Sequence, residues 1–294
     1  MKFVQAVFVV LFVAGYVASV EVEPHPDAAT IDGDKLGQRQ QILGTDRRNS
    51  SFSTNRLATN GYVAFDGEFP HHAEFYRHGS ANGLFYGSLI TPNYVLTSAS
   101  GVVALSMVEE GGMVSLGSEG VFDAYETINF TADGVTVHPF YQHSSVLYDI
   151  ATVRLNHAAT INHHVQPIRL PSLSDGRNYE LMEATTFAVA YDSSTYRRVV
   201  RYVRNKVMTN ADCNLEHPTV AFDVQHICTD SFIGGAFCHR NSGAALTIED
   251  ERGRVQIGIT RWMNDCDLNY PNLHVRVSTF RDFISMNSDY IFSF

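Results

Sequence analysis

Basic residues are scarce in this 294-residue chain, which has 21 Lys and Arg against 31 Asp and Glu and a formal net charge of −10 at pH 7. A surface that binds nucleic acid or an anionic membrane needs an excess of cationic side chains. The composition therefore argues against either as the main partner. The sequence also lacks the gapped Cys and His arrays of zinc sites, so we expect no metal, and nothing in it indicates a cofactor.

Long apolar runs are missing after the first 19 residues. Those residues, MKFVQAVFVVLFVAGYVAS, contain one basic residue, an apolar run and then small residues, a pattern typical of a secretory signal peptide. A membrane anchor is the alternative, but Gly15 and Tyr16 interrupt a run already shorter than the roughly 20 residues of a membrane span. We therefore expect a secreted, extracellular protein.

No cysteine occurs before residue 213. The four that follow are even in number, as two disulfides in an oxidising compartment require: Cys213, Cys228, Cys238 and Cys266. Two sequons begin at Asn49 and Asn129, and both are candidate N-glycosylation sites on an exported chain.

The chain divides into segments of different character. Residues 20–57 are polar and acidic at first, which predicts a flexible pro-region or linker, with Arg48 and Arg56 as candidate cleavage positions. Residues 58–294 form the predicted folded domain. Apolar and polar residues alternate over 255–260 and 273–277, which predicts strands with one buried face. Further strands are predicted at 84–90, 93–98, 112–116, 125–137, 149–155, 185–191 and 198–208, and a helix over 280–290. Many short strands predict an all-β sandwich or barrel.

Six segments in order resemble the chymotrypsin-like serine proteases. They are YGSLITPNYVLTSAS (86–100), VHPFYQHSSVLYDIATVRL (137–155), VQPIRLP (165–171), CHRNSGAAL (238–246), GITRWMNDC (258–266) and PNLHVRVSTFRDFI (271–284). The first is similar to the family's GGSLI…WVLTAAHC segment, and the fourth to CQGDSGGPL. The resemblance implies two antiparallel six-stranded β-barrels with a C-terminal helix.

The family's catalytic triad is incomplete in this chain. The resemblance places the nucleophilic serine at Ser242 and the carboxylate at Asp149, but the histidine position falls on Ser100. A serine hydroxyl cannot accept a proton at neutral pH and return it to the leaving amine. We therefore expect Asp149 to be a buried carboxylate satisfied by backbone amides or by Ser98 and Ser100. The histidines weighed as substitutes are His71, His72, His78, His143 and His239.

Other family positions have also changed. Asn241 replaces the aspartate that pairs with the new amino terminus after zymogen cleavage, and Arg240 replaces a glycine whose amide helps to form the oxyanion hole. The specificity pocket has Ala236 at its floor, and its wall is Arg261, Trp262 and Met263, where Met263 would fill the slot.

The resemblance also implies how the cysteines pair, with Cys213 joined to Cys228 and Cys238 to Cys266. One family disulfide is lost as a pair, because Phe85 and Gly101 stand at its two cysteine positions.

These changes predict a secreted serine protease homologue without catalytic activity. It would bind an extracellular protease, protease zymogen or inhibitor and regulate a proteolytic cascade. The alternative is a weak or specialised serine endopeptidase that uses Ser242. An inert secreted protein is a third reading. A basic run (Arg197, Arg198, Arg201, Arg204 and Lys206) is either a strip for an acidic partner or, as we prefer, a solvated strand surface.

Overall fold

The computed structural model describes residues 61–80, 82–117, 124–191, 198–217, 219–231, 241–261 and 270–294, all within the compact unit Ser53–Phe294. The predicted leader at 1–19, the predicted pro-region at 20–57 and the sequon at Asn49 lie outside these residues. Within the described part of the chain, no helix has the length and apolar character of a membrane span.

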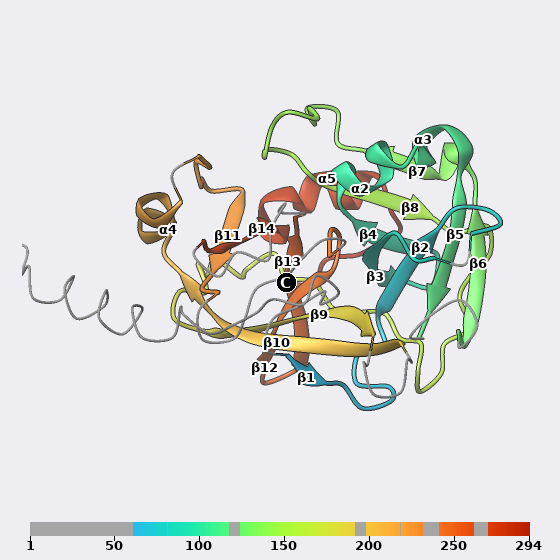
Figure 1. Cartoon of the computed structure of the whole chain (residues 1–294), viewed down its shortest axis with the longest axis horizontal. Helices are drawn as coiled ribbons and strands as arrows, with labels where there is room; N and C mark the ends of the chain where they lie inside the picture. The colour runs from blue at the N-terminus through green and yellow to red at the C-terminus, as the bar shows by residue number, and fades with distance from the viewer. Residues whose placement is uncertain are drawn as a thin grey trace, which may run out of the picture. The chain divides into compact units, whose positions relative to one another are not determined.

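The first antiparallel sheet forms a curled half-barrel in the order β6-β5-β2-β3-β4-β8-β7 (Figure 1). Its strands are β2 (His72–Tyr76), β3 (Phe85–Thr91), β4 (Tyr94–Thr97), β5 (Gly112–Leu116), β6 (Glu126–Phe130), β7 (Val135–Val137) and β8 (Ala151–Arg154). The pairings among described residues do not join β6 to β7, so the sheet curls without closing.

The second antiparallel sheet closes into a barrel in the order β1-β10-β11-β14-β13-β12-β9. Its strands are β1 (Tyr62–Val63), β9 (Glu183–Tyr191), β10 (Arg198–Met208), β11 (His226–Thr229), β12 (Ala245–Asp250), β13 (Gly253–Thr260) and β14 (Asn272–Arg276). Because β9 also pairs with β10, six strands close and β1 stays outside the ring. The all-β architecture is confirmed, with one closed six-stranded barrel and one curled half-barrel.

Packing of Phe85 against Gly101 occupies the place of the family disulfide that this chain lacks. The Phe85 ring stacks on Phe75, with centroids 4.4 Å apart and planes 7° from parallel. A Cβ atom on Gly101 would lie only 2.6 Å from Cδ2 of Phe85, so the glycine gives the ring its space. The Phe85 ring thus links β3 to the helix that carries Gly101 and Ser100.

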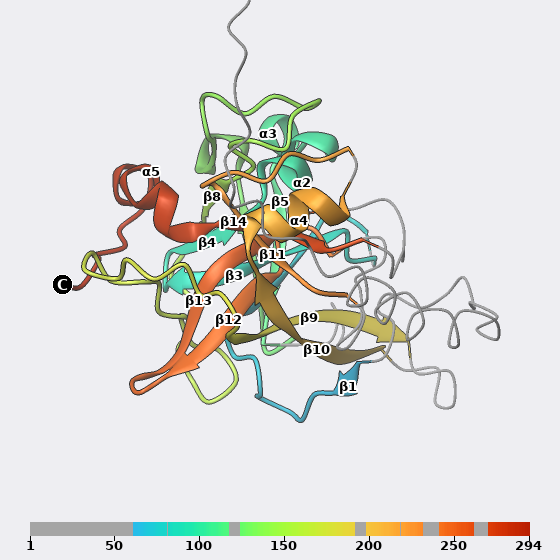
Figure 2. The same ribbon diagram turned by 90° about the vertical axis from the view of Figure 1, so that its left-hand side faces the viewer.

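The helices are short and lie at the edges of the strands. They are α2 (Ala99–Ala104), α3 (Met107–Glu110), α4 (Asn210–Glu216) and α5 (Arg281–Met286), with 3-10 turns η1 (Ala132–Gly134) and η2 (Val277–Phe280). Figure 2 shows α5 beside the strands and near the end of the chain. Phe283 and Ile284 of α5 pack with Leu96 of the first sheet and Ile259 of the second, so this helix ties the two sheets together. The predicted helix at 280–290 is thus present but ends earlier, and Met286 is 77% exposed.

Candidate functional site

Ser100 and Asp149 form the half of the site that the first sheet supplies. Strand β4 leads into α2, whose N-cap is Ser98, because the Ser98 Oγ accepts a hydrogen bond from the Gly101 amide at 3.3 Å. This turn brings Ser100 onto Asp149, which lies two residues before β8 and is completely buried. The Ser100 amide donates to Asp149 Oδ1 at 2.6 Å, and the Ser100 hydroxyl donates to Oδ2 at 2.8 Å.

Backbone hydrogen bonds to both sheets hold the segment that carries Ser242. The Tyr86 amide of β3 donates to the Ser242 carbonyl at 2.8 Å, and the Gly243 amide donates to the Thr260 carbonyl of β13 at 2.7 Å. Gly243 has a φ of +86°, and a side chain there would collide with the Tyr86 carbonyl. Ser242 is therefore fixed in place and is only 5% exposed.

The Ser242 hydroxyl contacts two other serine hydroxyls. Its Oγ lies 2.6 Å from Ser98 Oγ and 3.3 Å from Ser100 Oγ. The structure thus brings all three triad positions together, and it adds Ser98. We call Ser98, Ser100, Asp149 and Ser242 the serine cluster.

Arg261 also reaches Asp149, which the sequence analysis did not foresee. The resemblance placed Arg261 at the wall of the specificity pocket, but its Nε lies 3.6 Å from Asp149 Oδ2, and its guanidinium donates to the Ser145 carbonyl at 2.8 Å. Burial raises the pKa of Asp149, while the Arg261 charge and the Ser100 hydrogen bonds offset part of that rise. The signal for this contact was the Arg at a family serine position.

No histidine among the described residues hydrogen-bonds to Ser242. His71 and His72 are buried, and both rings contact Phe187, with centroids 5.5 and 5.0 Å away. His78 and His143 are exposed, while His239 lies outside the described residues. The described part of the chain therefore offers the Ser242 hydroxyl serine partners and no imidazole.

Several predicted site residues lie outside the described residues: Ala236, Cys238, Arg240, Trp262, Met263 and Cys266. Asn241 is described and buried. The disulfide between Cys213 and Cys228, which the resemblance implied, is present in the structure and joins α4 to β11. Asn129 is exposed on β6, where a glycan would meet solvent.

The predicted basic run does not form a row of free charges. Arg198 pairs with the buried carboxylate of Glu74, Arg201 donates to the Gly61 carbonyl at 3.0 Å, and Arg204 lies 3.8 Å from Glu183. Arg197 lies outside the described residues. Arg204 and Lys206 are exposed, as a solvated strand surface predicts, but Arg198 is held by a buried carboxylate, which our preferred interpretation did not include. The described residues also contain no group of His, Cys, Asp and Glu that could hold a metal ion.

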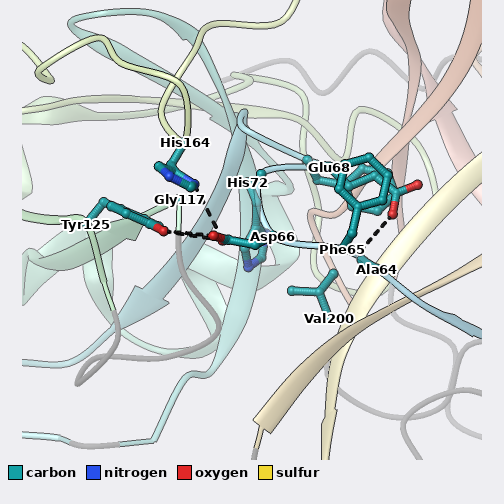
Figure 3. Close-up of a pocket in the computed structure, with 11 residues that line it drawn as sticks. Ala64, Phe65, Asp66, Glu68, His72, Gly117, Tyr125, His164 and Val200 are labelled. Atoms are coloured by element: carbon teal, nitrogen blue, oxygen red, sulfur yellow. Dashed lines mark hydrogen bonds and ion pairs between the residues drawn. The ribbon is translucent and has the colours of Figure 1, made fainter.

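A separate pocket of about 280 Å³ lies beneath the loop between β1 and β2 (Figure 3). None of its lining residues belongs to the serine cluster. Its Asp66 carboxylate already accepts from the Tyr125 hydroxyl at 3.1 Å and lies 3.4 Å from His164 Nδ1, while Glu68 accepts from the Phe65 amide. The acidic groups at this pocket are thus engaged with the protein, and we assign it no function.

Comparison with known proteins supplies the family. The family model described as Trypsin matches residues 58–284. The chain is 28% identical over 239 residues to a collagenase of Hypoderma lineatum, which covers 79% of this chain and 88% of that protein. It is 26% identical over 211 residues to the inactive CLIP domain-containing serine protease A8 of Anopheles gambiae, which covers 68% of this chain and 57% of that protein.

A solved structure of HL collagenase has the same fold. It superposes with a TM-score of 0.68 at 26% sequence identity, over 79% of this chain and 99% of that one. Together with the match to the family model, this likeness confirms the architecture and the ancestry that the six segments implied. The chain belongs to the trypsin family.

Proposed function

We propose that this chain is a secreted, non-catalytic member of the trypsin family that acts by binding proteins in an extracellular proteolytic cascade. Its partner would be a protease, a protease zymogen or a protease inhibitor. One observation carries the proposal. At Ser242 Oγ, two serine hydroxyls at 2.6 and 3.3 Å occupy the surroundings in which a serine protease needs an imidazole.

The physical argument concerns the proton of Ser242. Acyl transfer needs a base that takes this proton and later returns it to the leaving group. An imidazole does so because its pKa lies near neutral pH, whereas a serine hydroxyl does not hold an extra proton there. Loss of the base from a triad lowers turnover about a millionfold. Ser100 fills the position without supplying the base.

Three further observations support the proposal. The first 19 residues have the pattern of a signal peptide, and the Cys213–Cys228 disulfide suits an oxidising compartment. One relative carries the word inactive in its name. The chain also keeps the trypsin fold, and this fold gives proteases, zymogens and inhibitors a surface of the kind they already recognise.

Hydrolysis and binding are tested together on purified protein cleaved in the 20–57 segment. With peptide-ester substrates, we expect the wild type and Ser242→Ala to share one background rate. With an immobilised substrate-like protein inhibitor of trypsin, we expect both to bind alike. Turnover above the Ser242→Ala background would contradict the proposal. Absence of binding to the inhibitor, to active trypsin and to trypsinogen would favour an inert secreted protein.

A second candidate, a weak serine endopeptidase, is favoured by the contacts between Ser242, Ser100 and Asp149. The Ser242 proton would move to Ser100 Oγ at 3.3 Å, while the Ser100 proton moves to Asp149 Oδ2 at 2.8 Å. The raised pKa of Asp149 makes it a better proton acceptor than an exposed aspartate. The proton would then return along the same path to the leaving amine.

Three variants decide between the two candidates. If the relay operates, Ser242→Ala, Ser100→Ala and Asp149→Asn each abolish a measurable hydrolysis, because each breaks the path at a different oxygen. If the chain is non-catalytic, none of the three changes the background rate. A hydrolysis that survives Ser242→Ala comes from a contaminant.

A further inference from the structure

We propose that Ser98 is a positioning residue that turns the Ser242 hydroxyl toward the interior of the protein. Ser242 would then be idle for a reason that is separate from the missing imidazole. The inference rests on the proposed function only in treating Ser242 as unreactive. It predicts that a histidine restored at position 100 meets a hydroxyl that still faces Ser98.

The geometry of Ser98 carries the inference. Ser98 Oγ lies 2.6 Å from Ser242 Oγ, a shorter contact than the 3.3 Å between Ser100 and Ser242. Ser98 is completely buried. The Ser242 oxygen is therefore held against a completely buried hydroxyl. The similar family segment, WVLTAAHC, has an alanine at this place, and alanine offers no hydrogen bond.

Donor and acceptor counting fixes the direction of each hydrogen bond when Asp149 is ionised. A carboxylate only accepts, so the Ser100 hydroxyl donates its one proton to Asp149. Ser100 Oγ must then accept from Ser242, which uses the Ser242 proton. Ser242 Oγ must in turn accept from Ser98, whose own oxygen accepts from the Gly101 amide. The chain of hydrogen bonds runs from Ser98 through Ser242 and Ser100 to Asp149.

This arrangement commits both the proton and one lone pair of Ser242. A turn of the hydroxyl toward the cleft must break the bond from Ser98, which would leave a buried hydroxyl without its acceptor. Because Ser98 is held in turn by the N-cap contact with Gly101, it does not follow Ser242 outward. Two substitutions relative to the family motif, at residues 98 and 100, thus act on the same oxygen.

The test compares Ser100→His with Ser98→Ala/Ser100→His, using the rate at which a fluorophosphonate probe labels Ser242. In this reaction Ser242 Oγ bonds to phosphorus, fluoride leaves, and the introduced imidazole takes the proton. We expect the double variant to label about tenfold faster, the factor that corresponds to ~1.4 kcal/mol for one buried hydrogen bond. Equal rates would overturn the inference. A Ser98→Ala/Ser100→Asn variant shows whether labelling needs the imidazole as a base. Adding Ser242→Ala to the double variant shows whether Ser242 is the labelled residue.

A defective oxyanion hole could prevent labelling of both variants. In that case, crystal structures of the same variants test the role of Ser98. We expect Ser242 Oγ to face residue 98 in Ser100→His and to face the imidazole in the double variant. An oxygen that faces the imidazole in both, or that stays inward in both, would overturn the inference. If Ser98→Ala fails to fold because it removes the N-cap, Ser98→Gly replaces it, since glycine caps helices well.

The outcomes separate this inference from the proposed function. Labelling of the wild-type protein would refute the proposed function, while the ratio between the two variants would still report on Ser98. Equal labelling of the two variants would refute the role of Ser98 and leave the proposed function standing.

Discussion

The serine cluster, which is buried except for the half-buried Ser100, and the histidine pair, which we define as His71 and His72, stabilise their polar groups in different ways. In the serine cluster, hydrogen bonds within 3.3 Å connect every member, and Arg261 adds a positive charge near Asp149. In the histidine pair, both ring nitrogens of His72 and Nε2 of His71 have no hydrogen-bond partner among the described residues. Burial itself, with nearby positive charges, lowers both pKa values, that of His72 to about 3.

This fold keeps polar groups inside in two ways. One region satisfies a carboxylate with donors, and the other keeps its imidazoles neutral by removing them from water. Loss of a partner should therefore harm the serine cluster at any pH, whereas the histidine pair should fail only when acid forces protons onto it. We test this contrast first with acid, which acts on all of the buried histidines together, and then with single substitutions.

Acid should destabilise the protein through its buried histidines. Burial lowers the pKa of His72 and of His274 to about 3, against 6.5 for an exposed histidine. Because the unfolded chain binds these protons first, stability present above pH 6.5 is lost as pH falls toward 3, by up to about 1.4 kcal/mol per pH unit for each histidine. The raised pKa values of Asp149 and Glu74 act in the opposite direction.

A substitution of His72 isolates this effect. We expect His72→Gln to lose about 2.3 kcal/mol less than the wild type between pH 6.5 and pH 4.5, since it lacks one titrating group. Urea unfolding at both pH values measures the difference, with exposed His143→Gln as the matched control. Equal acid sensitivity of all three proteins would show that His72 does not titrate as burial predicts.

Glu74 provides the intermediate case of a buried carboxylate held by a guanidinium. It pairs with Arg198 of β10 and accepts from the Tyr76 hydroxyl at 2.6 Å, which links the first sheet to the second. We expect Glu74→Ala to lower the free energy of unfolding by about 3 kcal/mol, because the half-buried charge of Arg198 would keep only the neutral Tyr76 hydroxyl as a partner. Glu74→Gln should lose less, since its amide oxygen still accepts. A loss below 1 kcal/mol in Glu74→Ala would mean that this buried carboxylate does not depend on its partners.

Ser100→Ala tests the serine cluster at the Ser100 hydroxyl. Its hydrogen bond to Asp149 Oδ2 and its weaker contact with Ser242 Oγ disappear, while the bond from the backbone amide of residue 100 to Asp149 remains. A hydrogen bond to a charged group contributes about 1.5–3 kcal/mol, so we expect a loss in this range in chemical unfolding at pH 7. Ser288→Ala is the control, because Ser288 is a partly buried serine after α5 whose hydroxyl donates to the Ile284 carbonyl. A neutral result would mean that water replaces the Ser100 hydroxyl.

The smallest effect should come from the exposed pair of Arg204 and Glu183. Their closest atoms are 3.8 Å apart, and their side chains are 51% and 64% exposed. Such pairs contribute little, so we expect Arg204→Ala to change the free energy of unfolding by less than about 0.5 kcal/mol. A large loss would mean that burial does not separate the strong pairs of this protein from the weak ones.

Much of the fold was predictable from sequence, because alternating apolar and polar residues indicate a strand and its buried face. Residues 112–116 and 198–208 were predicted as strands and form β5 and β10 with the same bounds. Strand β2 was missed, although HAEFY alternates polar and apolar residues over its first four positions; all five residues are buried, so the strand has no solvent-facing side. The strand predicted at 125–137 is broken by η1 at Ala132–Gly134, so it forms β6 and β7.

At the site, the sequence was enough to locate residues that have a family counterpart, but it did not predict contacts that the family lacks. The resemblance located Ser100, Asp149 and Ser242, because their flanking segments keep the register. It marked Arg261 as a departure from the family serine but did not show that Arg261 reaches Asp149 or that Ser98 binds Ser242, since these contacts span 112 and 144 residues of sequence. Only the folded arrangement brings such distant side chains within bonding distance.

Labelling of the wild-type protein by a fluorophosphonate probe tests the central claim most directly. The account predicts that Ser242 remains unmodified under conditions that label active trypsin to completion, as measured by intact-protein mass spectrometry. Stoichiometric addition to Ser242 that vanishes in Ser242→Ala would show a working base beside this hydroxyl and contradict the account.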